Sequence, residues 1–582
     1  MSHIVGIDLG TTNSLVAVFQ NGQPRLIPNA HGKVLTPSIV GVLGSGEVVV
    51  GDTARELRVT EPTRCVWAFK RWMGQSRQVS LADRVMTPPE LSSLILRSLK
   101  QDAELFLGGS VSEAVITVPA YFNEHQRKAT RLAGELAGLK VRRIINEPTA
   151  AALAYGFHER DAEKRLLVFD LGGGTFDVTL MDVSSGIMEI VATAGENFLG
   201  GEDFTERIVA DLLSRQGLQL EVEEHRHPRR VSRLRSECEA AKRALLETET
   251  ASIRLPDAEG QFPTGGEVIT LSREDFTRIA QPLLKRLQGP LDRVLRDAQM
   301  GPAQVDDVIL VGGASRLRDV AGLMTGMFGR PPRGGLNPDE VVALGAAIQS
   351  ALMRDEAEVQ DLVMTDVCPH SLGVQVAKVI GGRQEEGYFS PIIHRNTTIP
   401  VSREEIYCTL SMNQTSIKLQ IFQGESRHCR DNLQLGTLEV SGIPPGPPGQ
   451  TIIVRFTYDL NGLLEVESLV PGTDKRFQVV LNQDAAGLSP AEVREAVERM
   501  RQVKFYPRDQ LENQRLLQYC ERLVGEVAPQ DRATLEEALD VFEQGLSSGN
   551  REVFAASRST LLQVLALLGF EAPEFEGDAN AS

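Results

Sequence analysis

The feature that most constrains the fold of this chain is a repeated element made of a strand, an aspartate and a glycine-rich turn. Segments 5–18 (VGIDLGTTNSLVAV) and 168–180 (VFDLGGGTFDVTL) align at a constant offset, so that Asp8 matches Asp170. Glycine lets backbone N–H groups come close to an anion, and small hydroxyl residues add further donors. Two such turns in register predict two lobes that hold one polyphosphate between them.

The aspartates before the two turns predict a bound cation. A carboxylate cannot itself bind phosphate, but it can hold hydrated Mg²⁺, which keeps several waters and engages one or two carboxylates. We therefore expect Asp8 and Asp170 to hold Mg²⁺ through water.

A third glycine-containing turn fits the same ligand. The strand expected at 308–311 leads into Gly312 and Gly313, and Arg316 follows. We expect this backbone to approach the ribose and α-phosphate of a nucleotide, with the Arg316 guanidinium available to stack on the base.

The chain changes its pattern three times. Up to residue 353, short β-branched runs alternate with helical patterns, which is typical of α/β architecture. Segment 355–366 is charged with an apolar centre, and by itself it predicts a strap that docks on a surface and an exposed connection equally well. Strand patterns follow to residue 487, and from residue 488 the chain is helical, with an N-cap at Ser489 and a tail that we expect to be disordered. The expected strands of the first part include 4–18, 114–118, 166–182 and 308–311, and its expected helices include 90–107, 124–136 and 341–353.

Composition excludes several classes of protein. The net charge of -17 argues against nucleic acid, whose binding relies on basic residues, and we read the one basic stretch, 226–235, as a solvated helix start. No apolar run reaches the roughly 20 residues that cross a bilayer, and no signal peptide is recognised at the N-terminus. The six cysteines are scattered without a CxxC pair, so neither a disulfide scaffold nor a zinc site is predicted. We expect a cytoplasmic protein that binds neither membrane nor nucleic acid.

Several motifs together resemble those of the DnaK-type (seventy-kilodalton) heat-shock chaperones, and in detail the bacterial HscC branch. These motifs are IDLGTTNS at 7–14, INEPTAAALAYG at 145–156, FDLGGGTFDVT at 169–179, NFLGGEDF at 197–204, VGGASR at 311–316, NPDEVVALGAAIQ at 337–349 and RNTTIPV at 395–401.

The resemblance implies a multidomain chain. Residues 1–353 would form an actin-like α/β ATPase domain of two lobes, 354–366 an interdomain linker, 367–487 a β-sandwich that binds peptide, and 488–582 a short α-helical lid with its tail. The implied activity is that of an ATP-dependent chaperone, in which hydrolysis of ATP to ADP closes a groove over extended hydrophobic segments of client polypeptides. The implied cofactors are ATP or ADP, Mg²⁺ and K⁺, and the implied partners are clients, a J-domain co-chaperone and a nucleotide exchange factor.

The resemblance also assigns residues to the nucleotide site. Lys70 would stabilise the charge that develops during phosphoryl transfer, and Glu147 and Asp177 would help to place the metal and the attacking water. Without its motif, Lys70 would be read as a surface lysine. The phosphate contacts would be Gly10, Thr11, Thr12, Asn13, Gly172, Gly173, Gly174, Thr175 (also counted as catalytic), Gly201 and Glu202, beside the metal-holding Asp8 and Asp170. The adenosine pocket would be Glu239, Lys242, Arg243, Gly312, Gly313, Arg316 and Asp339.

Two further sets of residues follow from the resemblance. The set that relays nucleotide state to the linker would be Pro119, Arg127, Asp361, Leu362 and Val363. The set that lines the peptide groove would be Val374, Ala377, Tyr407, Leu410, Ile417, Leu419 and Leu463, which equally well describes the core of a sandwich.

Some positions depart from the family pattern. Segment 212–255 is short, which puts a standard exchange-factor surface in doubt, and Leu246 replaces a small hydroxyl residue beside adenosine. Tyr407 and Leu410 are bulkier than usual, which favours a narrower client range. The helical region is short and lacks a terminal EEVD, and a smaller lid should release peptide faster.

Two other functions remain open at this point. A small-molecule kinase on the same actin-like fold would use the phosphate loops but would leave residues 367–582 unexplained. An actin-like filament protein would also bind nucleotide, although the appended β and helical regions argue against assembly as its main role.

Overall fold

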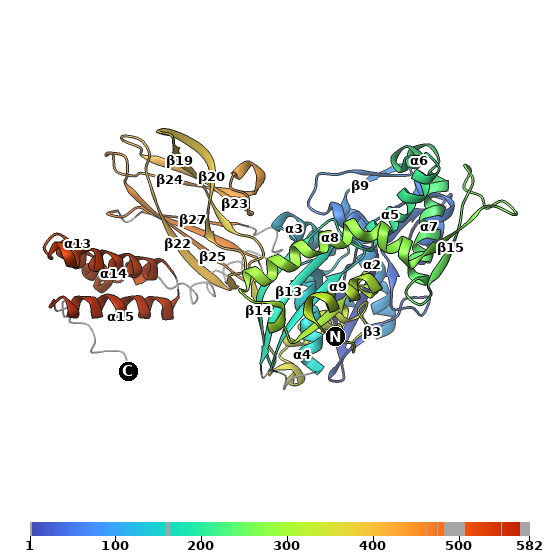
Figure 1. Cartoon of the computed structure of the whole chain (residues 1–582), viewed down its shortest axis with the longest axis horizontal. Coiled ribbons are helices and arrows are strands. Elements are labelled where there is room, and N and C mark those ends of the chain that lie inside the picture. The colour runs from blue at the N-terminus through green and yellow to red at the C-terminus, as the bar shows by residue number, and fades with distance from the viewer. Residues whose placement is uncertain are drawn as a thin grey trace. The chain divides into compact units, whose positions relative to one another are not determined.

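The computed structural model describes residues 3–158, 163–184, 186–460, 462–473, 475–481, 507–548 and 550–570. The chain forms two compact units, 1–369 (unit 1) and 370–582 (unit 2) (Figure 1). The helical N-cap expected at Ser489 and the disordered tail lie outside the described residues.

Unit 1 is built on two similar sheets. In sheet I the strand order is β11-β10-β1-β2-β3, and in sheet II the order is β17-β12-β13-β14-β18. The strands of sheet I are β1 (His3–Asp8), β2 (Asn13–Gln20), β3 (Gln23–Ile27), β10 (Val111–Val118) and β11 (Lys140–Asn146). The strands of sheet II are β12 (Lys164–Leu171), β13 (Phe176–Ser184), β14 (Ile187–Glu196), β17 (Asp307–Val311) and β18 (Val363–Val367).

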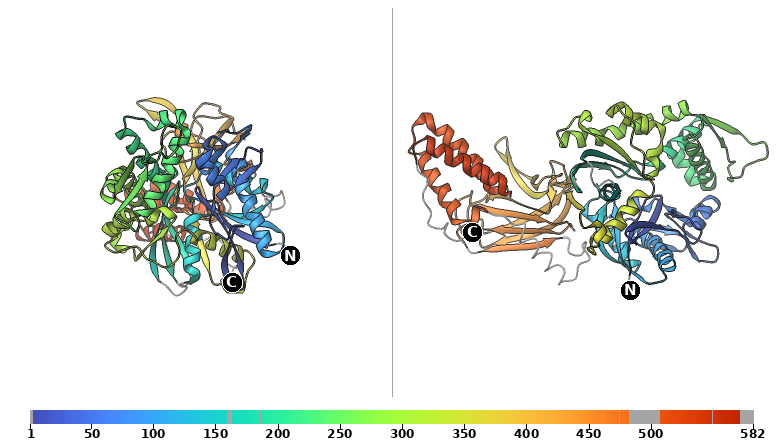
Figure 2. Two further views of the ribbon diagram at one scale, coloured as in Figure 1. Left: turned by 90° about the vertical axis from the view of Figure 1, so that its right-hand side faces the viewer. Right: turned by 90° about the horizontal axis from the view of Figure 1, so that it is seen from below.

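The sequence repeat is also a repeat of topology. In sheet I, β1 pairs antiparallel with β2 and parallel with β10. In sheet II, β12 pairs antiparallel with β13 and parallel with β17. Each glycine-rich turn therefore connects the first two strands of its sheet, and the two sheets form the centres of the first and second halves of unit 1. In Figure 2 (right) the first half is blue and the second half is mainly green.

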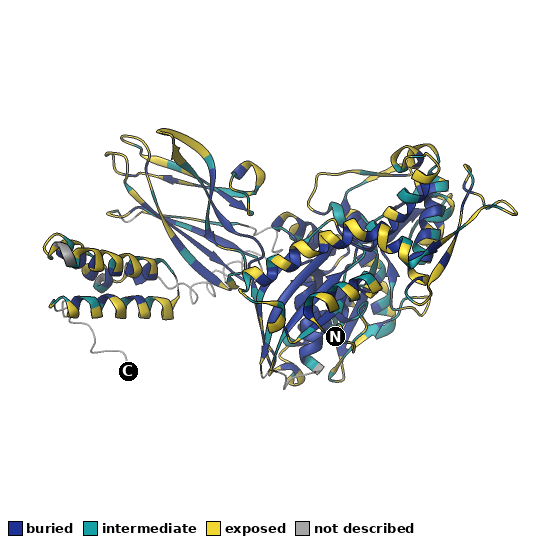
Figure 3. Ribbon diagram, in the orientation of Figure 1, coloured by how far each residue is buried: buried dark blue, intermediate teal, exposed yellow. Residues whose placement is uncertain are grey.

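Helices cover the two sheets, whose central strands are buried (Figure 3). The helix α10 (Val341–Leu352) packs against both β1 and α4 (Glu147–His158). It comes so close that a Cβ at Gly345 would lie 1.7 Å from the carbonyl oxygen of Ala150, which is why glycine is needed there. The other helices of unit 1 are α1 (Asp52–Thr60), α2 (Pro88–Leu107), α3 (Glu124–Leu136), α5 (Gly201–Arg215), α6 (Leu220–Arg226), α7 (Pro228–Ala244), α8 (Arg273–Asp297) and α9 (Arg318–Phe328).

Short strands complete unit 1 as small hairpins and sheets. These strands are β4 (Thr36–Pro37), β5 (Ile39–Val42), β6 (Val48–Val50), β7 (Cys65–Trp67), β8 (Val79–Leu81), β9 (Arg84–Met86), β15 (Thr250–Arg254) and β16 (Val268–Ser272).

The strand and helix predictions for the first part of the chain are confirmed within a few residues at each end. The interpretation of the basic stretch 226–235 as a solvated helix start was right only in part. A helix, α7, does begin at Pro228, but its Arg235 is buried and forms ion pairs with Glu206 and Glu224. A buried arginine in a basic run cannot be distinguished from its exposed neighbours without the tertiary fold.

The segment after α10 docks on sheet II. Val359 and Leu362 are buried in the core between the two sheets, and β18 adds to β14 as a parallel strand, with Val363 opposite Ile187. The local sequence left a docking strap and an exposed connection equally open, and the structure has the docked strap.

Unit 2 contains two antiparallel sheets and a helical bundle. The sheet orders are β20-β19-β23-β24 and β22-β25-β26-β27. The strands are β19 (Leu372–Ile380), β20 (Arg383–Ile393), β22 (Val401–Cys408), β23 (Ser416–Gln423), β24 (Leu433–Ser441), β25 (Thr451–Tyr458), β26 (Leu464–Leu469) and β27 (Arg476–Leu481). The helices α13 (Leu511–Val524), α14 (Pro529–Ser547) and α15 (Arg551–Leu567) pack around an apolar core of their own.

Candidate functional site

A cavity of about 450 Å³ lies between the two halves of unit 1. Both glycine-rich turns, the start of α5, α7 and the Gly312–Arg316 turn reach its wall. The predicted site residues that line it are Asp8, Gly10, Thr11, Thr12, Asn13, Lys70, Glu147, Asp170, Gly172, Gly173, Thr175, Gly201, Glu202, Glu239, Lys242, Arg243, Gly312, Gly313, Arg316 and Asp339. The structure therefore brings together residues that are up to about three hundred positions apart in the sequence.

The two glycine-rich turns touch each other across the cavity. A Cβ at Gly173 would lie 1.5 Å from the Thr12 hydroxyl oxygen, and a Cβ at Gly174 would lie 2.5 Å from Cγ2 of Thr11. The second turn is also held from behind, because the N–H groups of Gly201 and Glu202 donate to the carbonyls of Gly172 and Gly173 at 2.9 Å each. Only residues without a side chain allow so close an approach.

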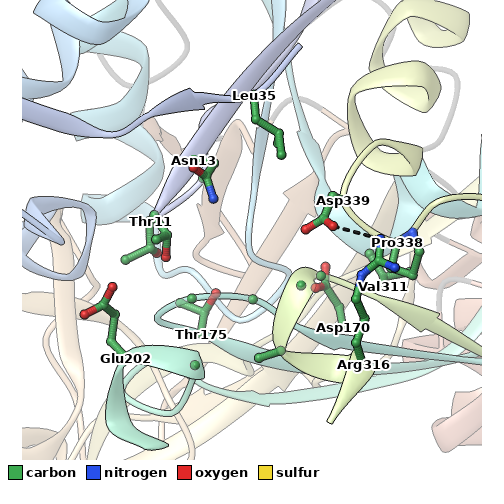
Figure 4. Close-up of a pocket in the computed structure, with 18 of the residues that line it drawn as sticks. Thr11, Asn13, Leu35, Asp170, Thr175, Glu202, Val311, Arg316, Pro338 and Asp339 are labelled. Atoms are coloured by element: carbon green, nitrogen blue, oxygen red, sulfur yellow. Dashed lines mark hydrogen bonds and ion pairs between the residues drawn. The ribbon is translucent and has the colours of Figure 1, made fainter. Parts of the chain in front are cut away.

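Two threonine hydroxyls beside these turns are available to a ligand. Thr11 Oγ1 and Thr12 Oγ1 are buried, and neither has a hydrogen-bond partner among the described residues. Because a buried hydroxyl without a partner is costly, these groups fit the oxygens of a phosphate group. Thr11, Thr175 and Glu202 lie around the same part of the cavity in Figure 4.

Three aspartates lie beside the phosphate loops, of which Asp170 and Asp177 are buried and Asp8 is half-buried. Burial, and then the charge of Glu147, raise the pKa of Asp8 and of Asp177 to about 7. Burial and the charges of Glu147, Asp177 and Asp8 hold the pKa of Asp170 well above its usual value. Carboxylates in this setting are stabilised in their charged form by a cation.

The donor set fits a hydrated Mg²⁺ ion. Asp170 Oδ2 is buried without a hydrogen-bond partner among the described residues, whereas Asp8 Oδ1 accepts from the Thr117 hydroxyl at 3.0 Å. Among the residues that the structure describes, no group of three or more His, Cys, Asp or Glu side chains could ligate a metal directly. Two carboxylates with water between them and the ion match the way in which Mg²⁺ is usually held.

Lys70 is a buried residue, so the alternative of a surface lysine was wrong. The short 3₁₀ helix η2 (Phe69–Trp72) carries it to the cavity wall, where only 3% of the residue is exposed. Its ammonium group donates to Glu147 Oε1 at 2.6 Å. Burial of a cation requires a partner of opposite charge, and Glu147 provides it.

The far end of the cavity is lined by α7 and by the Gly312–Arg316 turn. Lys242 is buried, with Nζ 2.6 Å from Glu239 Oε2, and donates to the carbonyl of Gly201 at 2.7 Å. Burial opposes the charge of Glu239, but Lys242, the Thr205 hydroxyl and Arg243 together lower its pKa to about 2. These contacts fix a polar edge on α7 that faces the cavity.

Arg316 does not extend freely into the cavity. Its guanidinium donates to Asp339 Oδ2 at 2.9 Å (Figure 4). It also donates to Asn337 Oδ1 at 2.5 Å. Sequence reasoning did not find the apolar lining residues, which are Leu15, Leu35, Val311, Ala314, Leu317, Pro338 and Val342, because nothing in their local pattern separates them from ordinary core residues.

Two predicted residues do not reach the cavity wall. Gly174 belongs to the second loop but does not line the cavity, and Asp177 is buried on β13, where its Oδ1 accepts from the Tyr121 N–H at 3.1 Å. In this structure both residues lie next to the lining residues without facing the cavity themselves.

A comparison with protein-family models identifies the chain. The model of the Hsp70 protein family matches residues 4–81 and 75–546. The chain belongs to the Hsp70 family. Members of this family are ATPases and ATP-dependent chaperones that bind ATP or ADP with Mg²⁺ and act on client polypeptides with co-chaperones. No helix in the described part of the chain is long and apolar enough to cross a membrane.

The Hsp70 chain connects the phosphate site to its docked strand through polar side chains. Arg127 donates to the Asn146 side-chain oxygen at 2.5 Å, and the Asn146 amide donates to both carboxylate oxygens of Asp366 at 3.1 Å. Asn146 immediately precedes Glu147, the partner of Lys70. The predicted relay set included Arg127 but not Asn146 or Asp366, although Asn146 lies within the recognised segment 145–156.

The other residues of the predicted relay set lie beside β18 or near Arg127. Leu362 is buried, Asp361 and Val363 are exposed, and the Val363 N–H donates to the Gly186 carbonyl at 3.1 Å. Pro119 directly follows β10, and its carbonyl accepts from the Phe122 N–H at 3.1 Å.

The seven predicted groove residues of unit 2 have different environments. Val374, Leu419 and Leu463 are buried core residues, and Leu410 is exposed. Ala377, Tyr407 and Ile417 are half-buried, and the Tyr407 hydroxyl lies 3.2 Å from the Ser390 hydroxyl. This set contains both core side chains and side chains that a ligand can reach.

Proposed function

We propose that this Hsp70 chain hydrolyses ATP in the cavity of unit 1 and uses this reaction to control the binding of extended apolar polypeptide segments by unit 2. The observation that carries the proposal is the meeting of two glycine loops, two unpartnered threonine hydroxyls and the carboxylates of Asp8 and Asp170 at one cavity. Unit 1 would be the two-lobed, actin-like ATPase domain of residues 1–353, followed by the linker, sandwich and lid expected from the sequence.

The residues at the cavity have different roles in the proposed hydrolysis. Backbone N–H groups of both loops, with the hydroxyls of Thr11, Thr12 and Thr175, bind the phosphates. Asp8 and Asp170 would hold Mg²⁺ through water, and the ion would supply positive charge beside the phosphates. Lys70, held by Glu147, stabilises the charge that develops on the transferred group, while Glu147 and Asp177 orient the attacking water.

Lys70 offers a direct test of this assignment. A Lys70→Ala chain should bind ATP and hydrolyse it about a hundredfold more slowly, because one preorganised charge is missing from the transition state. Hydrolysis at the unchanged rate would contradict the role of Lys70.

The docked strand is the proposed route from ATP to unit 2. The series Arg127, Asn146 and Asp366 runs from the neighbourhood of Glu147 to β18. Pro119, Asp361, Leu362 and Val363 complete the proposed relay. ATP can control docking only if the docked form binds ATP more tightly than the undocked form.

In unit 2 we propose that exposed Leu410 and half-buried Ala377, Tyr407 and Ile417 contact an extended client segment. Buried Val374, Leu419 and Leu463 would support them from the core. The client would add main-chain hydrogen bonds and place an apolar side chain between them. The size of Tyr407 and Leu410 favours a narrow range of clients.

The finer assignments rest on the sequence motifs. We propose that the chain is closest to the HscC branch, works in the cytoplasm with a J-domain partner, and uses K⁺ beside Mg²⁺. An exchange factor would have to act despite the short segment 212–255.

A small-molecule kinase is the alternative that the cavity alone would also permit. It gives no role to the sandwich and bundle of unit 2 or to the docked β18. A kinase would transfer phosphate to an added sugar, and a filament protein would pellet in ATP, whereas the proposed chaperone releases inorganic phosphate and stays in solution.

The decisive experiment follows a short fluorescent apolar peptide by anisotropy, with the protein first in ADP and then in ATP. We expect slow release in ADP and fast release on addition of ATP. Thr175→Ala, which removes a phosphate contact, and Leu362→Asp, which places a charge under the docked strand, should each abolish the response. ATP binding without peptide binding in either state would contradict the proposed use of unit 2.

A further inference from the structure

Arg71 connects the two halves of unit 1 directly behind the phosphate loops. It follows Lys70 on η2, in the first half. Its Nε donates to the carbonyl of Gly174 at 3.1 Å, and its two terminal nitrogens donate to the two carboxylate oxygens of Asp203, with Nη1 3.2 Å from Oδ1. Both partners belong to the second half.

Asp203 is part of the support of the second phosphate loop. Its Oδ2 accepts from the Gly200 N–H at 2.7 Å and so caps the first turn of α5. The next two residues of that turn donate to the loop, from Gly201 to Gly172 and from Glu202 to Gly173. Loop and helix start therefore form one rigid body, and the Arg71 guanidinium holds this body at two points, through Gly174 and through Asp203.

Arg71 has no place on the cavity wall, whereas its neighbour Lys70 does. Its guanidinium is mostly buried and is committed to the loop and the helix cap. A group in this position cannot be a direct phosphate ligand, but it can determine where the loop lies relative to Lys70.

We propose that Arg71 is a positioning residue for ATP hydrolysis, which holds the second phosphate loop at the distance from Lys70 that the reaction requires. The inference rests on the proposed ATPase activity. A planar guanidinium gripping a carboxylate at two points fixes both distance and orientation, which a lysine ammonium cannot do. Misplacement of a reacting group by about 1 Å can slow a reaction by about a hundredfold.

The test compares single-turnover hydrolysis with nucleotide affinity in the full-length chain. Arg71→Met should slow hydrolysis by about ten- to a hundredfold. The Kd for ATP and the melting temperature without nucleotide should stay close to those of the unmodified chain. Arg71→Lys should recover part of the rate. Arg77→Met is the matched control, because Arg77 is exposed in the same half of unit 1, where it stacks on Trp72 at 3.8 Å, and its loss should leave the rate unchanged.

A double-mutant cycle identifies the partner. Asp203→Asn keeps an oxygen that can accept from the Gly200 N–H, so the start of α5 stays capped while the charge is lost. If Arg71 acts through Asp203, the two substitutions together should slow hydrolysis little more than Arg71→Met alone.

The outcomes separate this inference from the proposed function. Hydrolysis at the normal rate in Arg71→Met would overturn the positioning role. A parallel fall in the rate of hydrolysis and in ATP affinity would also overturn the positioning role, because Arg71 would then bind nucleotide directly. A fall in melting temperature large enough to account for the lost rate would overturn it as well. Absence of hydrolysis in the unmodified chain would instead contradict the proposed ATPase.

Discussion

Arg455 and Glu404 lie opposite each other on neighbouring strands of unit 2 and form an ion pair of 2.8 Å in which the side chains are 2% and 1% exposed. Arg508 contributes a second guanidinium to the same carboxylate at 3.1 Å, and it also donates to the Ser547 hydroxyl on α14. One carboxylate thus balances two arginines and connects the second sheet of unit 2 to its helical bundle.

Glu404→Gln should strongly destabilise unit 2. The substitution removes the charge of a buried carboxylate that two arginines contact, which costs about 3–5 kcal/mol. Arg508→Met should cost less, because Arg455 and Glu404 remain as a neutral pair. Urea unfolding followed by circular dichroism measures both. Glu526→Gln, which breaks the exposed pair with Arg522, is the control and should change stability by less than about 1 kcal/mol. An equal effect of Glu404→Gln and Glu526→Gln would refute the prediction.

Glu239 should make the stability of unit 1 depend on pH in acid. Its pKa of about 2 in the folded chain lies below its ordinary value of 4.5, so the folded state favours the ionised form. Its stabilising contribution is complete above about pH 4.5 and is lost as the pH falls toward 2. A difference of about two and a half pKa units corresponds to about 3 kcal/mol.

The measurement compares thermal unfolding of the unmodified chain and of Glu239→Gln between pH 7 and pH 3.5 without nucleotide. The difference in melting temperature between the unmodified chain and Glu239→Gln should be largest at pH 7 and should narrow below pH 4.5. Glu237→Gln, on the same helix and paired with exposed Arg254, should show no comparable gap. A gap for Glu239→Gln that widened in acid would have the wrong sign.

Gly173→Ala should weaken nucleotide binding without unfolding the chain. The new methyl group would lie 1.5 Å from the Thr12 hydroxyl, so the two phosphate loops must move apart. We expect the Kd for ATP to rise at least tenfold, or about 1.4 kcal/mol. Gly322→Ala, in α9, where nothing lies within 4 Å of the added carbon, is the control for calorimetric titration. Unchanged affinity in Gly173→Ala would mean that the loops do not grip the ligand together.

Asp366→Ala should release β18 from β14. The substitution leaves the Asn146 amide without the carboxylate that accepts its two hydrogen bonds. Protease cleavage between residues 354 and 367 should become faster, since a docked strand resists proteolysis in proportion to its stability. Gln360→Ala, at an exposed position in the same segment, should be cleaved at the normal rate. Equal cleavage of both variants would mean that Asp366 does not hold the strand.

The sequence predicted the parts of the site that depend on local chemistry. A glycine turn after an aspartate can be recognised because the chemistry lies within a few consecutive residues, and Asp8 and Asp170 reach the cavity as expected. Lys70 needed its motif, because its partner Glu147 is 77 residues away.

Contacts that depend on tertiary packing could not be predicted. Arg71 and Asp203 are 132 residues apart, and Arg455 and Glu404 are 51 residues apart. Each of these residues is an ordinary charged residue in its own segment, and only the folded chain shows that it is buried and paired. The same reason hid Arg235 in a basic run and Asp366 in the docked strand.

The short pairing between β18 and β14 has a consequence for solubility. Only three residue pairs join the strands, from Ile187 and Val363 to Glu189 and Thr365. When β18 leaves, the newly uncovered edge of β14 is brief and carries the exposed charge of Glu189. Short, charged edges are poor templates for strands of other molecules. If the proposed relay undocks this strand, the edge that it uncovers therefore offers little opportunity for aggregation.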